Sequence, residues 1–414
     1  MERAVQRLFQ KGFSTYAANR GLPLHHHKAA YWLQNCRTAR LGGHAQVCEN
    51  GHVAGVWYNS CHHRYCPQCN GPIKERWLER LKGSLIQCEH RHLIFTIDHA
   101  LNDLWRCNRR VLADLLFQAV DETLKSFLGD DRGATPGYLL CLHTWSRSLA
   151  LHPHIHCLIT EGGLDSQGEW QRPRLDCFLP ARAVMPKFRG KLLALIRQAA
   201  ATERLVLPAE LTPQRLKNRL NQLGRKKWNV RIQTRYAHGA GVATYLARYL
   251  RGGPIRNSQL TVHDDEHIVY RYYSEAAGPS RMVEPVARFL PRLLEHIPEP
   301  NRPTVRRYGL YAPSKPEDLN RARQRCGQPA VAEQPETLTV DDFLSKLSGH
   351  RRETCPTCGA PLYAGVPTPT AQSPPSRHRS VMENSRTGMR APSVAGYSTC
   401  RNRKTGRPTW RICR

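Results

Sequence analysis

The segment 149–160 reads LALHPHIHCLIT, and histidine occupies every second position from His152 to His156. A β-strand sends alternate side chains to opposite faces of its sheet. We therefore expect His152, His154 and His156 to project from one face, while the apolar residues between them project from the other. This pattern requires a sheet whose two faces differ, because one face must accommodate a row of imidazoles.

The segment 137–145, GYLLCLHTW, also has the composition of a strand. The residues that join it to 152–160 are too few for a helical crossover, so we predict an antiparallel pair. Elsewhere the patterns predict strands at 90–98 and within 258–273, and helices at 1–35, 72–88, 101–129, 187–235, 241–253 and 285–297.

Two imidazoles on one strand face can bind one divalent cation when a neighbouring element supplies a third ligand. His154 and His156 are the candidates, and the third ligand would be His143 or His152. The alternative is a set of surface or hydrogen-bonded histidines with no metal.

Residues 48–69, CENGHVAGVWYNSCHHRYCPQC, combine thiols and imidazoles at close spacing. Zinc takes four nitrogen or sulfur ligands in a tetrahedron, and ligand pairs separated by a loop supply them. We predict a structural zinc site, and His52 competes for one place in it. The favoured ligands are Cys48, Cys61, Cys66 and Cys69. The alternatives are unpaired buried thiols or a redox pair.

A further CxxC motif, Cys355 to Cys358, is a candidate half of a second site. Its partners would be Cys400 and Cys413, or ligands from another chain.

The charge is strongly unbalanced, with 62 Lys and Arg against 33 Asp and Glu and a net charge of +29. Such an excess favours nucleic acid as the partner, and an acidic lipid surface is the alternative. No uninterrupted apolar run approaches the ~18 residues of a membrane span, and the N-terminus lacks a signal-peptide core. We therefore expect no membrane partner and a cytoplasmic location, where the fifteen cysteines would be thiols or metal ligands.

Within 241–253, GVATYLARYLRGG, Tyr245 and Tyr249 are four residues apart and share one helix face, with Arg248 and Arg251 beside them. The alternative is an amphipathic helix whose tyrosines pack in the core. A tyrosine hydroxyl can also attack a phosphodiester and form a covalent phosphotyrosine. A cation held by the histidines would polarise that phosphate.

The most basic segment, 213–235, is expected to follow the backbone of single-stranded DNA. Lys226 and Lys227 would bind phosphates, and Trp228 would stack on a base. The alternative is a solvated basic helix face.

Three segments, LHTWSRSLALHPHIHCLIT, YLARYLRGGPIRNSQL and RRYGLYA, resemble the two-tyrosine transposases of the insertion sequence 91 family, which belong to the His-hydrophobe-His (HUH) endonucleases. The segment LGGHAQVCENGHVAGVWYNSCHHRYCPQC resembles the N-terminal zinc-binding domain of that family. The family often has a CxxCGH-like run where this chain has CENGH, which makes His52 a substitute ligand.

This resemblance implies an α+β fold with a ferredoxin-like antiparallel sheet flanked by helices. It implies a rolling-circle-type transposase that nicks and rejoins single-stranded or hairpin DNA at element ends. Tyr245 and Tyr249 would be the nucleophiles, and His154 and His156 would bind Mg²⁺ or Mn²⁺. The protein would act at the bacterial nucleoid.

With this resemblance we divide the chain into four parts: a zinc-binding domain at 1–89, the nuclease domain at 90–312, a segment with the CxxC motif at 313–364, and a disordered basic tail at 365–414. Two other functions remain open. One is a replication initiator or relaxase that uses the same chemistry. The other is a non-catalytic, zinc-containing DNA-binding protein. The oligomeric state also remains open.

Overall fold

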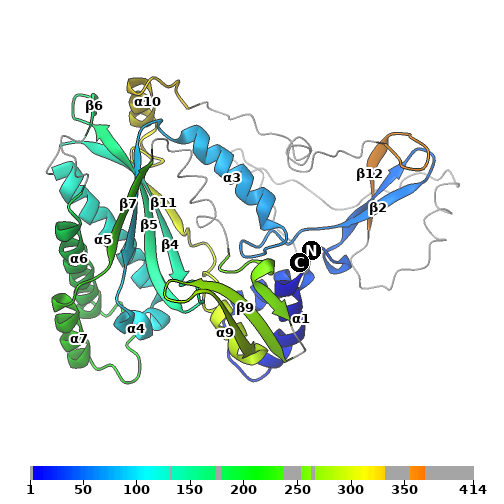
Figure 1. Ribbon diagram of the computed structural model, residues 1–414, viewed down its shortest axis with the longest axis horizontal. Coiled ribbons are helices and arrows are strands. Elements are labelled where there is room, and N and C mark those ends of the chain that lie inside the picture. Colours follow the sequence, from blue (N-terminus) through cyan, green and yellow to red (C-terminus); the bar gives the residue numbers. More distant parts are fainter. Residues whose placement is uncertain are drawn as a thin grey trace, which may run out of the picture.

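The structure is a computed structural model. It describes residues 3–130, 133–172, 179–236, 253–262, 266–331 and 354–368. Within these residues the strands form three antiparallel sheets, and the largest carries the histidine segment (Figure 1).

The largest sheet has six strands in the order β11-β4-β5-β3-β7, and β6 pairs with β5 at one end. Its strands are β3 (His90–Thr96), β4 (Thr135–Trp145), β5 (Leu151–Leu164), β6 (Trp170–Gln171), β7 (Val230–Tyr236) and β11 (Val305–Gly309). Helices separate β3 from β4 and β5 from β7, and β7-β3-β5-β4 is the strand order of a ferredoxin-like sheet. The predicted α+β fold class is confirmed.

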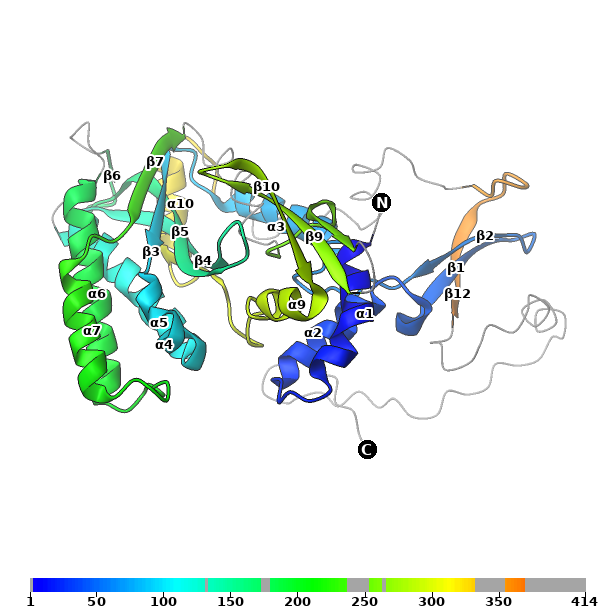
Figure 2. The ribbon, with the colours of Figure 1, turned by 60° about the horizontal axis from the view of Figure 1, so that its bottom comes forward.

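One face of this sheet packs against a layer of helices, α4 (Asn102–Cys107), α5 (Arg109–Lys125), α6 (Ala181–Ala201) and α7 (Pro213–Arg225). Ile155, Cys157 and Ile159 of β5 point into this layer and are fully buried. In α5, Leu112, Leu116 and Val120 recur at helical spacing and meet them. Figure 2 shows α5, α6 and α7 together on one side of the sheet.

The opposite face of the sheet carries the histidines and is covered in part by α3 (Asn70–Ser84) and α10 (Pro316–Arg325). Leu81 of α3 packs with Leu139, Leu158 and Tyr311 at one end of this face. The even-numbered residues of β5 lie here, as the alternation predicts.

A second core joins the N-terminal helices to residues late in the chain. It lies between α1 (Ala4–Ala17), α2 (Leu24–Asn35), α9 (Val286–Leu294) and the sheet of β8 (Leu260–Val262), β9 (His267–Ser274) and β10 (Gly278–Pro285). Short 3-10 or π turns lie at Ala39–Leu41, His99–Leu101, Ser126–Asp130 and Asn257–Gln259.

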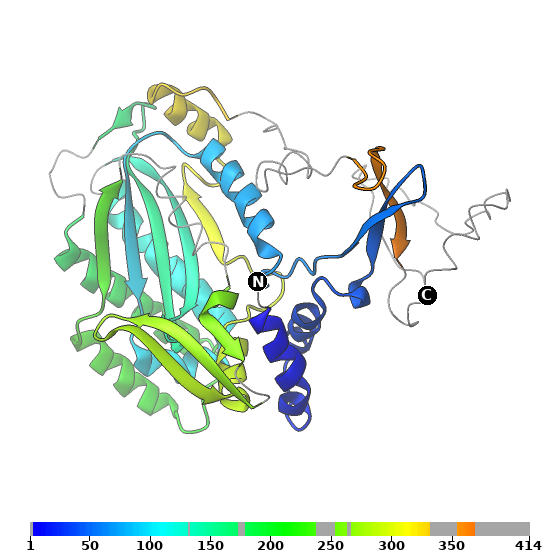
Figure 3. The same cartoon turned by 45° about the vertical axis from the view of Figure 1, so that its right-hand side comes forward.

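The third sheet, which we call the arm, stands apart from the rest of the molecule (Figure 3). It consists of β1 (Gly43–Cys48), β2 (Val53–Tyr58) and β12 (Leu362–Thr368), with β1 in the middle. β12 pairs antiparallel with β1, from Cys48 opposite Leu362 to Gly43 opposite Thr368. The arm therefore contains strands from both ends of the described chain.

Several sequence predictions need correction. The segment 187–235 is not one helical region, because α6 ends at Ala201, α7 spans Pro213–Arg225 and β7 follows. Pro213 begins α7, where the hydroxyl of Thr212 caps the helix by accepting from the Arg215 amide, 3.2 Å away. The tail expected to be disordered from residue 365 begins inside β12. Of the helices in the described part of the chain, none is long and apolar enough to cross a bilayer.

Candidate functional site

Three histidines meet on the face of β4 and β5 that lies opposite the layer of α5, α6 and α7. His143 lies directly opposite His154 in the strand register, and His156 is the next residue on the same face. One ring nitrogen from each lies within 4.8 Å of those of the other two, and the Nε2 atoms of His154 and His156 are 3.1 Å apart. The three side chains are 2%, 9% and 8% exposed. The geometry brings His143, and not His152, into this cluster.

Hydrogen bonds indicate which ring nitrogen is available in His154 and in His156. The Nδ1–H of His154 donates to the carbonyl of His152 at 2.6 Å, which leaves Nε2 as an acceptor. The side-chain oxygen of Gln233 lies 2.9 Å from Nδ1 of His92, and Nε2 of His92 lies 2.9 Å from Nδ1 of His156. When Gln233 accepts from His92, His92 in turn accepts from His156, and Nε2 of His156 keeps its lone pair.

Burial lowers the pKa values of His154 and His156. It lowers the pKa of His154 to about 4, with the nearby His152 and His92 as smaller causes. Burial and the neighbouring His143 place the pKa of His156 well below its usual value. Neutral imidazole is the form that binds divalent cations, so His154 and His156 are in their ligating form at neutral pH.

Trp145 and its neighbours cover the outer side of the cluster. Its indole stacks on His143 with ring centroids 4.5 Å apart, and the ring of Tyr65 meets Trp145 edge-on at 6.0 Å. Gly253 lies so close to Tyr65 that a Cβ added there would be 3.0 Å from the Tyr65 Cα.

The predicted nucleophiles Tyr245 and Tyr249, with Arg248 and Arg251, lie outside the described residues. The last described residue before them is Tyr236, which pairs with His90 on β3. The first described residue after them is Gly253, which lies against Tyr65. Tyr65 in turn contacts Trp145, which stacks on His143.

Four buried cysteines gather where the helices α2 and α3 approach each other. The sulfur atoms of Cys36, Cys61, Cys66 and Cys69 lie within 4.8 Å of one another, and those of Cys61 and Cys69 are 3.6 Å apart. Cys36 directly follows α2, and Cys69 directly precedes α3. The backbone N–H of His63 donates to the Cys61 sulfur at 3.4 Å, as is common at thiolate ligands.

The predicted grouping of Cys48 with Cys61, Cys66 and Cys69 differs from the structure. The fourth cysteine of the cluster is Cys36. Cys48 lies at the end of β1, in the arm, and is therefore not in this cluster. Cys48 and His52 instead lie with Cys355 and Cys358, within 4.8 Å of one another. The predicted partners Cys400 and Cys413 lie outside the described residues.

Sequence reasoning missed Cys36, His92 and Gln233. A cysteine immediately after a predicted helix, only twelve positions before Cys48, was a visible signal for Cys36. For His92, the signal was the pattern His90-Arg91-His92 on the neighbouring predicted strand. The sequence offers no signal for Gln233, whose role depends on the pairing of β3 with β7.

The predicted DNA contacts near residue 226 are only partly accessible. Lys226 and Lys227 are exposed. Trp228 is 7% exposed, its indole N–H donates to the carbonyl of Leu223 at 3.1 Å, and its ring packs edge-on against Phe188. The prediction that Trp228 stacks on a base is therefore wrong, because this side chain belongs to the core.

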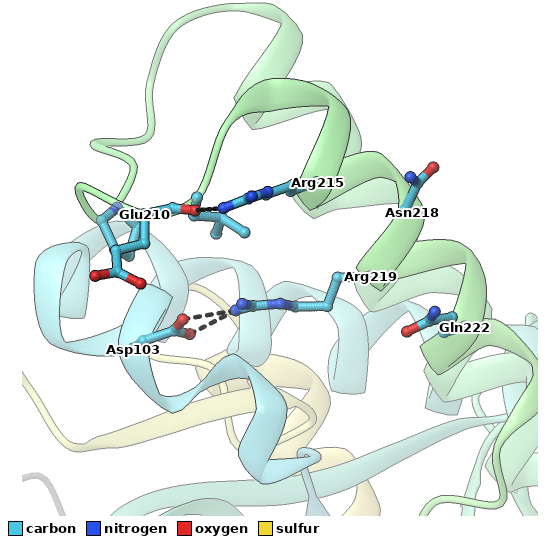
Figure 4. Close-up of a pocket in the computed structure, with 8 residues that line it drawn as sticks. Asp103, Glu210, Arg215, Asn218, Arg219 and Gln222 are labelled. Atoms are coloured by element: carbon cyan, nitrogen blue, oxygen red, sulfur yellow. Dashed lines mark hydrogen bonds and ion pairs between the residues drawn. The ribbon is translucent and has the colours of Figure 1, made fainter.

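A separate polar pocket of about 420 Å³ lies between α4 and α7. There Arg219 pairs with Asp103 at 2.7 Å, and Arg215 donates to the Glu210 carbonyl at 3.0 Å (Figure 4). The helices that form it cover the face of the sheet opposite to the histidines. This pocket is therefore not part of the histidine site.

Comparisons with known proteins agree with this arrangement. A family described as "Transposase zinc-binding domain" matches residues 8–97, and one described as "Putative transposase" matches residues 137–318. "Putative transposase y4qJ" of Sinorhizobium fredii is 29% identical over 338 residues, which cover 79% of this chain and 85% of the relative. "Transposase for insertion sequence element IS801" of Pseudomonas savastanoi pv. phaseolicola is 29% identical over 292 residues, covering 67% and 68%. No solved structure gives a significant match.

The fold and these matches define the class of the protein, a transposase with an N-terminal zinc-binding domain, and hence a DNA-cleaving enzyme whose partner is DNA. The chain belongs to the transposase family of insertion sequence 91. A structural zinc ion is a component of this domain, and a four-cysteine cluster is present to bind it.

Proposed function

We propose that this transposase cleaves and rejoins one DNA strand through a covalent phosphotyrosine, with a divalent cation bound by His143, His154 and His156. The observation that carries the proposal is the convergence of three buried imidazoles from two adjacent strands. Hydrogen bonds from their Nδ1 side already orient His154 and His156 for binding through Nε2.

The donor set fits a divalent cation. Three neutral imidazoles suit transition-metal ions better than Mg²⁺, which prefers oxygen ligands. We therefore expect Mn²⁺ to support cleavage at lower concentrations than Mg²⁺. The cation would withdraw electron density from the scissile phosphate and offset the charge on the leaving oxygen.

Tyr245 and Tyr249 are the proposed nucleophiles. The phenolic oxygen forms a bond to phosphorus and its proton passes to solvent. The bond from phosphorus to the 3′ oxygen breaks, and this oxygen leaves as a hydroxyl after taking up a proton. The 5′ phosphate stays on the tyrosine, so attack by a 3′ hydroxyl can reverse the step and join strands. Two tyrosines allow one chain to hold two DNA ends.

The substrate is single-stranded or hairpin DNA at the ends of the element, because an unpaired strand gives the tyrosine in-line access to phosphorus. Exposed Lys226 and Lys227, with Arg248 and Arg251, would bind its phosphates. This substrate would place the protein at the bacterial nucleoid, and the mode of action would be rolling-circle transposition.

Cys36, Cys61, Cys66 and Cys69 are the proposed ligands of the structural zinc. They are buried between α2 and α3, so one bound ion would connect the two helices. The four sulfur atoms complete a tetrahedral set without Cys48 or His52.

Incubation of labelled single-stranded element-end DNA with Mn²⁺, Mg²⁺ or EDTA tests the proposal. Denaturing gels would compare the wild type with Tyr245→Phe, Tyr249→Phe and the double variant. We expect a protein-linked 5′ product that needs the cation and disappears in the double variant. The single variants would show which tyrosine acts first.

Tyr273→Phe is a matched control, since this tyrosine is exposed on β9 and distant in sequence from the proposed nucleophiles. It should leave the product unchanged. A covalent product that survives in the double variant, or tight DNA binding without a covalent product on any end sequence, would rule out tyrosine chemistry.

A further inference from the structure

We propose that the chain binds a second zinc ion through Cys48, His52, Cys355 and Cys358, and that this ion fastens the C-terminal strand β12 to the N-terminal hairpin. Cys355 and Cys358 lie outside both ranges that the transposase families match. The inference does not depend on the proposed nuclease chemistry.

The ligand atoms have the spacing of a tetrahedral zinc site. The Cys48 sulfur lies 3.7 Å from the Cys358 sulfur and 3.6 Å from Nδ1 of His52. Zinc–sulfur bonds of about 2.3 Å and zinc–nitrogen bonds of about 2.0 Å give tetrahedral edges of about 3.8 Å and 3.5 Å, respectively. A disulfide would need sulfur atoms about 2 Å apart, so this separation fits two ligands of one ion.

Each pair of ligands sits in a tight turn that holds the pair in position. In the first turn the Gly51 amide donates to the Cys48 carbonyl at 2.9 Å, and the Cys48 amide donates to the His52 carbonyl at 3.1 Å. In the second turn the Gly359 amide donates to the Cys355 carbonyl at 2.8 Å. Two such turns facing each other form a zinc knuckle pair.

Two glycines make these turns possible. Gly51 has a φ of 78° and Gly359 has a φ of 73°, in the left-handed region that other residues rarely adopt. An outer contact supports the ligands as well, because the side-chain amide of Asn50 donates to the Cys358 sulfur at 3.3 Å.

In the part of the arm whose side chains the structure describes, no buried hydrophobic cluster holds the strands together. None of the described residues of β1, β2 and β12 belongs to the three buried hydrophobic clusters. Large apolar side chains of the arm are instead exposed, namely Val53, Val56, Trp57, Tyr58 and Tyr363. A small sheet without a covered face is marginal in water, and small units of this kind are commonly stabilised by a metal.

The second site shares no ligand with the four-cysteine cluster, so these two sites should bind one zinc ion each. The two sites also differ in the sequence separation of their ligands. The second one joins residues that are 310 positions apart in the sequence.

Metal analysis of the purified full-length protein tests the proposal. The three-histidine cluster is a further candidate site for zinc, so the count is made in a His143→Ala background. In that background we expect two zinc ions per chain, and one when the double substitution Cys355→Ser/Cys358→Ser is added. The matched control Cys107→Ser changes an exposed cysteine outside both clusters and should retain two. In hydrogen exchange, the double variant should lose protection in 43–58 and 354–368 and keep it in β3, β4 and β5.

A second variant guards against a simple folding failure. Cys358→His replaces one zinc ligand by another, and it should retain more of the second zinc than Cys358→Ser does. One zinc ion per chain in the His143→Ala background would overturn the proposal. So would two ions when the double substitution is added to it, or equal loss of zinc in Cys358→His and Cys358→Ser.

Discussion

The six-stranded sheet and the arm both carry clustered histidine and cysteine side chains, but they are held together differently. The six-stranded sheet packs one face against α5, α6 and α7 and part of the other against α3. The arm packs against no helix layer, and its described strands contribute nothing to the buried clusters. The same types of ligand therefore occur in two different physical settings.

The difference indicates what each cluster is for. In the six-stranded sheet the hydrophobic core fixes the strands, so we expect the fold to survive substitution of His143, His154 or His156. In the arm the turns that carry Cys48 and Cys355 have no such support, so their ligands would themselves supply the stability. Four substitutions test this comparison.

Truncation of a buried side chain should give the largest difference in stability between a change in the six-stranded sheet and a change in the arm. Phe95 of β3 is fully buried and meets Phe188 edge-on with centroids 5.1 Å apart. Phe95→Ala should lower the free energy of unfolding by about 3–5 kcal/mol. Val56→Ala, in the exposed arm, should change it by less than about 0.5 kcal/mol. Urea unfolding followed by fluorescence measures both, and similar losses would contradict the comparison.

Removal of a proposed cation ligand should abolish activity and spare the fold. His143→Ala should reduce the rate of strand cleavage by about 10³-fold, since a bound cation contributes several kcal/mol to such a step. His152→Ala is the matched control, because the hydrogen bond that His154 donates is accepted by the backbone carbonyl of His152, which the substitution retains. Cleavage kinetics and circular dichroism would be compared. A larger defect in His152→Ala than in His143→Ala would indicate that His152, and not His143, is the third ligand of the cation.

Acid should destabilise the six-stranded sheet through His90. Its Nδ1–H donates to the Cys88 carbonyl, its Nε2 lies 2.8 Å from the Tyr311 hydroxyl, and burial lowers its pKa to about 4. The unfolded chain takes up this proton near pH 6.5 and the folded chain only near pH 4. The stability from neutral His90 is therefore complete above pH 6.5 and is lost as the pH falls toward 4, by about 3 kcal/mol in total.

His90→Gln removes this titration while it keeps polar atoms at the site. The free energies of unfolding of wild type and variant should therefore converge by about 3 kcal/mol between pH 7 and pH 4. A constant difference between wild type and His90→Gln at every pH would show that His90 does not titrate as we expect.

The smallest effect is expected from Gln233, which orients His156 through His92. Gln233→Leu removes the acceptor for His92 and should weaken Mn²⁺ binding by roughly 10-fold, at the low end for outer partners of a metal site. Gln233→Glu keeps an acceptor and should retain wild-type affinity. Titration of cleavage with Mn²⁺ measures both. Equal Mn²⁺ affinities of the Gln233→Leu and Gln233→Glu variants would mean that Gln233 does not position His156.

The sequence predicted the large sheet better than the arm. The alternation at 152–156 reveals one face of a strand directly, because the period of two is a local property of the backbone. The pairing with 137–145 followed from the short connection, and the structure has this pairing.

The grouping of the cysteines could not be predicted in the same way. Spacing alone cannot show whether Cys36 or Cys48 joins Cys61, because the direction of β1 determines which of the two sulfur atoms lies near the other cysteines. Nor can it show that Cys358 meets Cys48, since that contact spans 310 positions. Trp228 was misassigned because a basic neighbourhood does not reveal whether an aromatic side chain is buried.

The pairing of β12 with β1 has a consequence for biosynthesis. The ribosome makes the hairpin of β1 and β2 early, but β12 ends at residue 368. At roughly 5–20 residues per second, the hairpin waits on the order of tens of seconds for its third strand. A chain interrupted by a premature stop or a frameshift upstream of residue 354 has no third strand at all. The arm can therefore be completed only in a chain whose translation has passed through nearly all of the described protein.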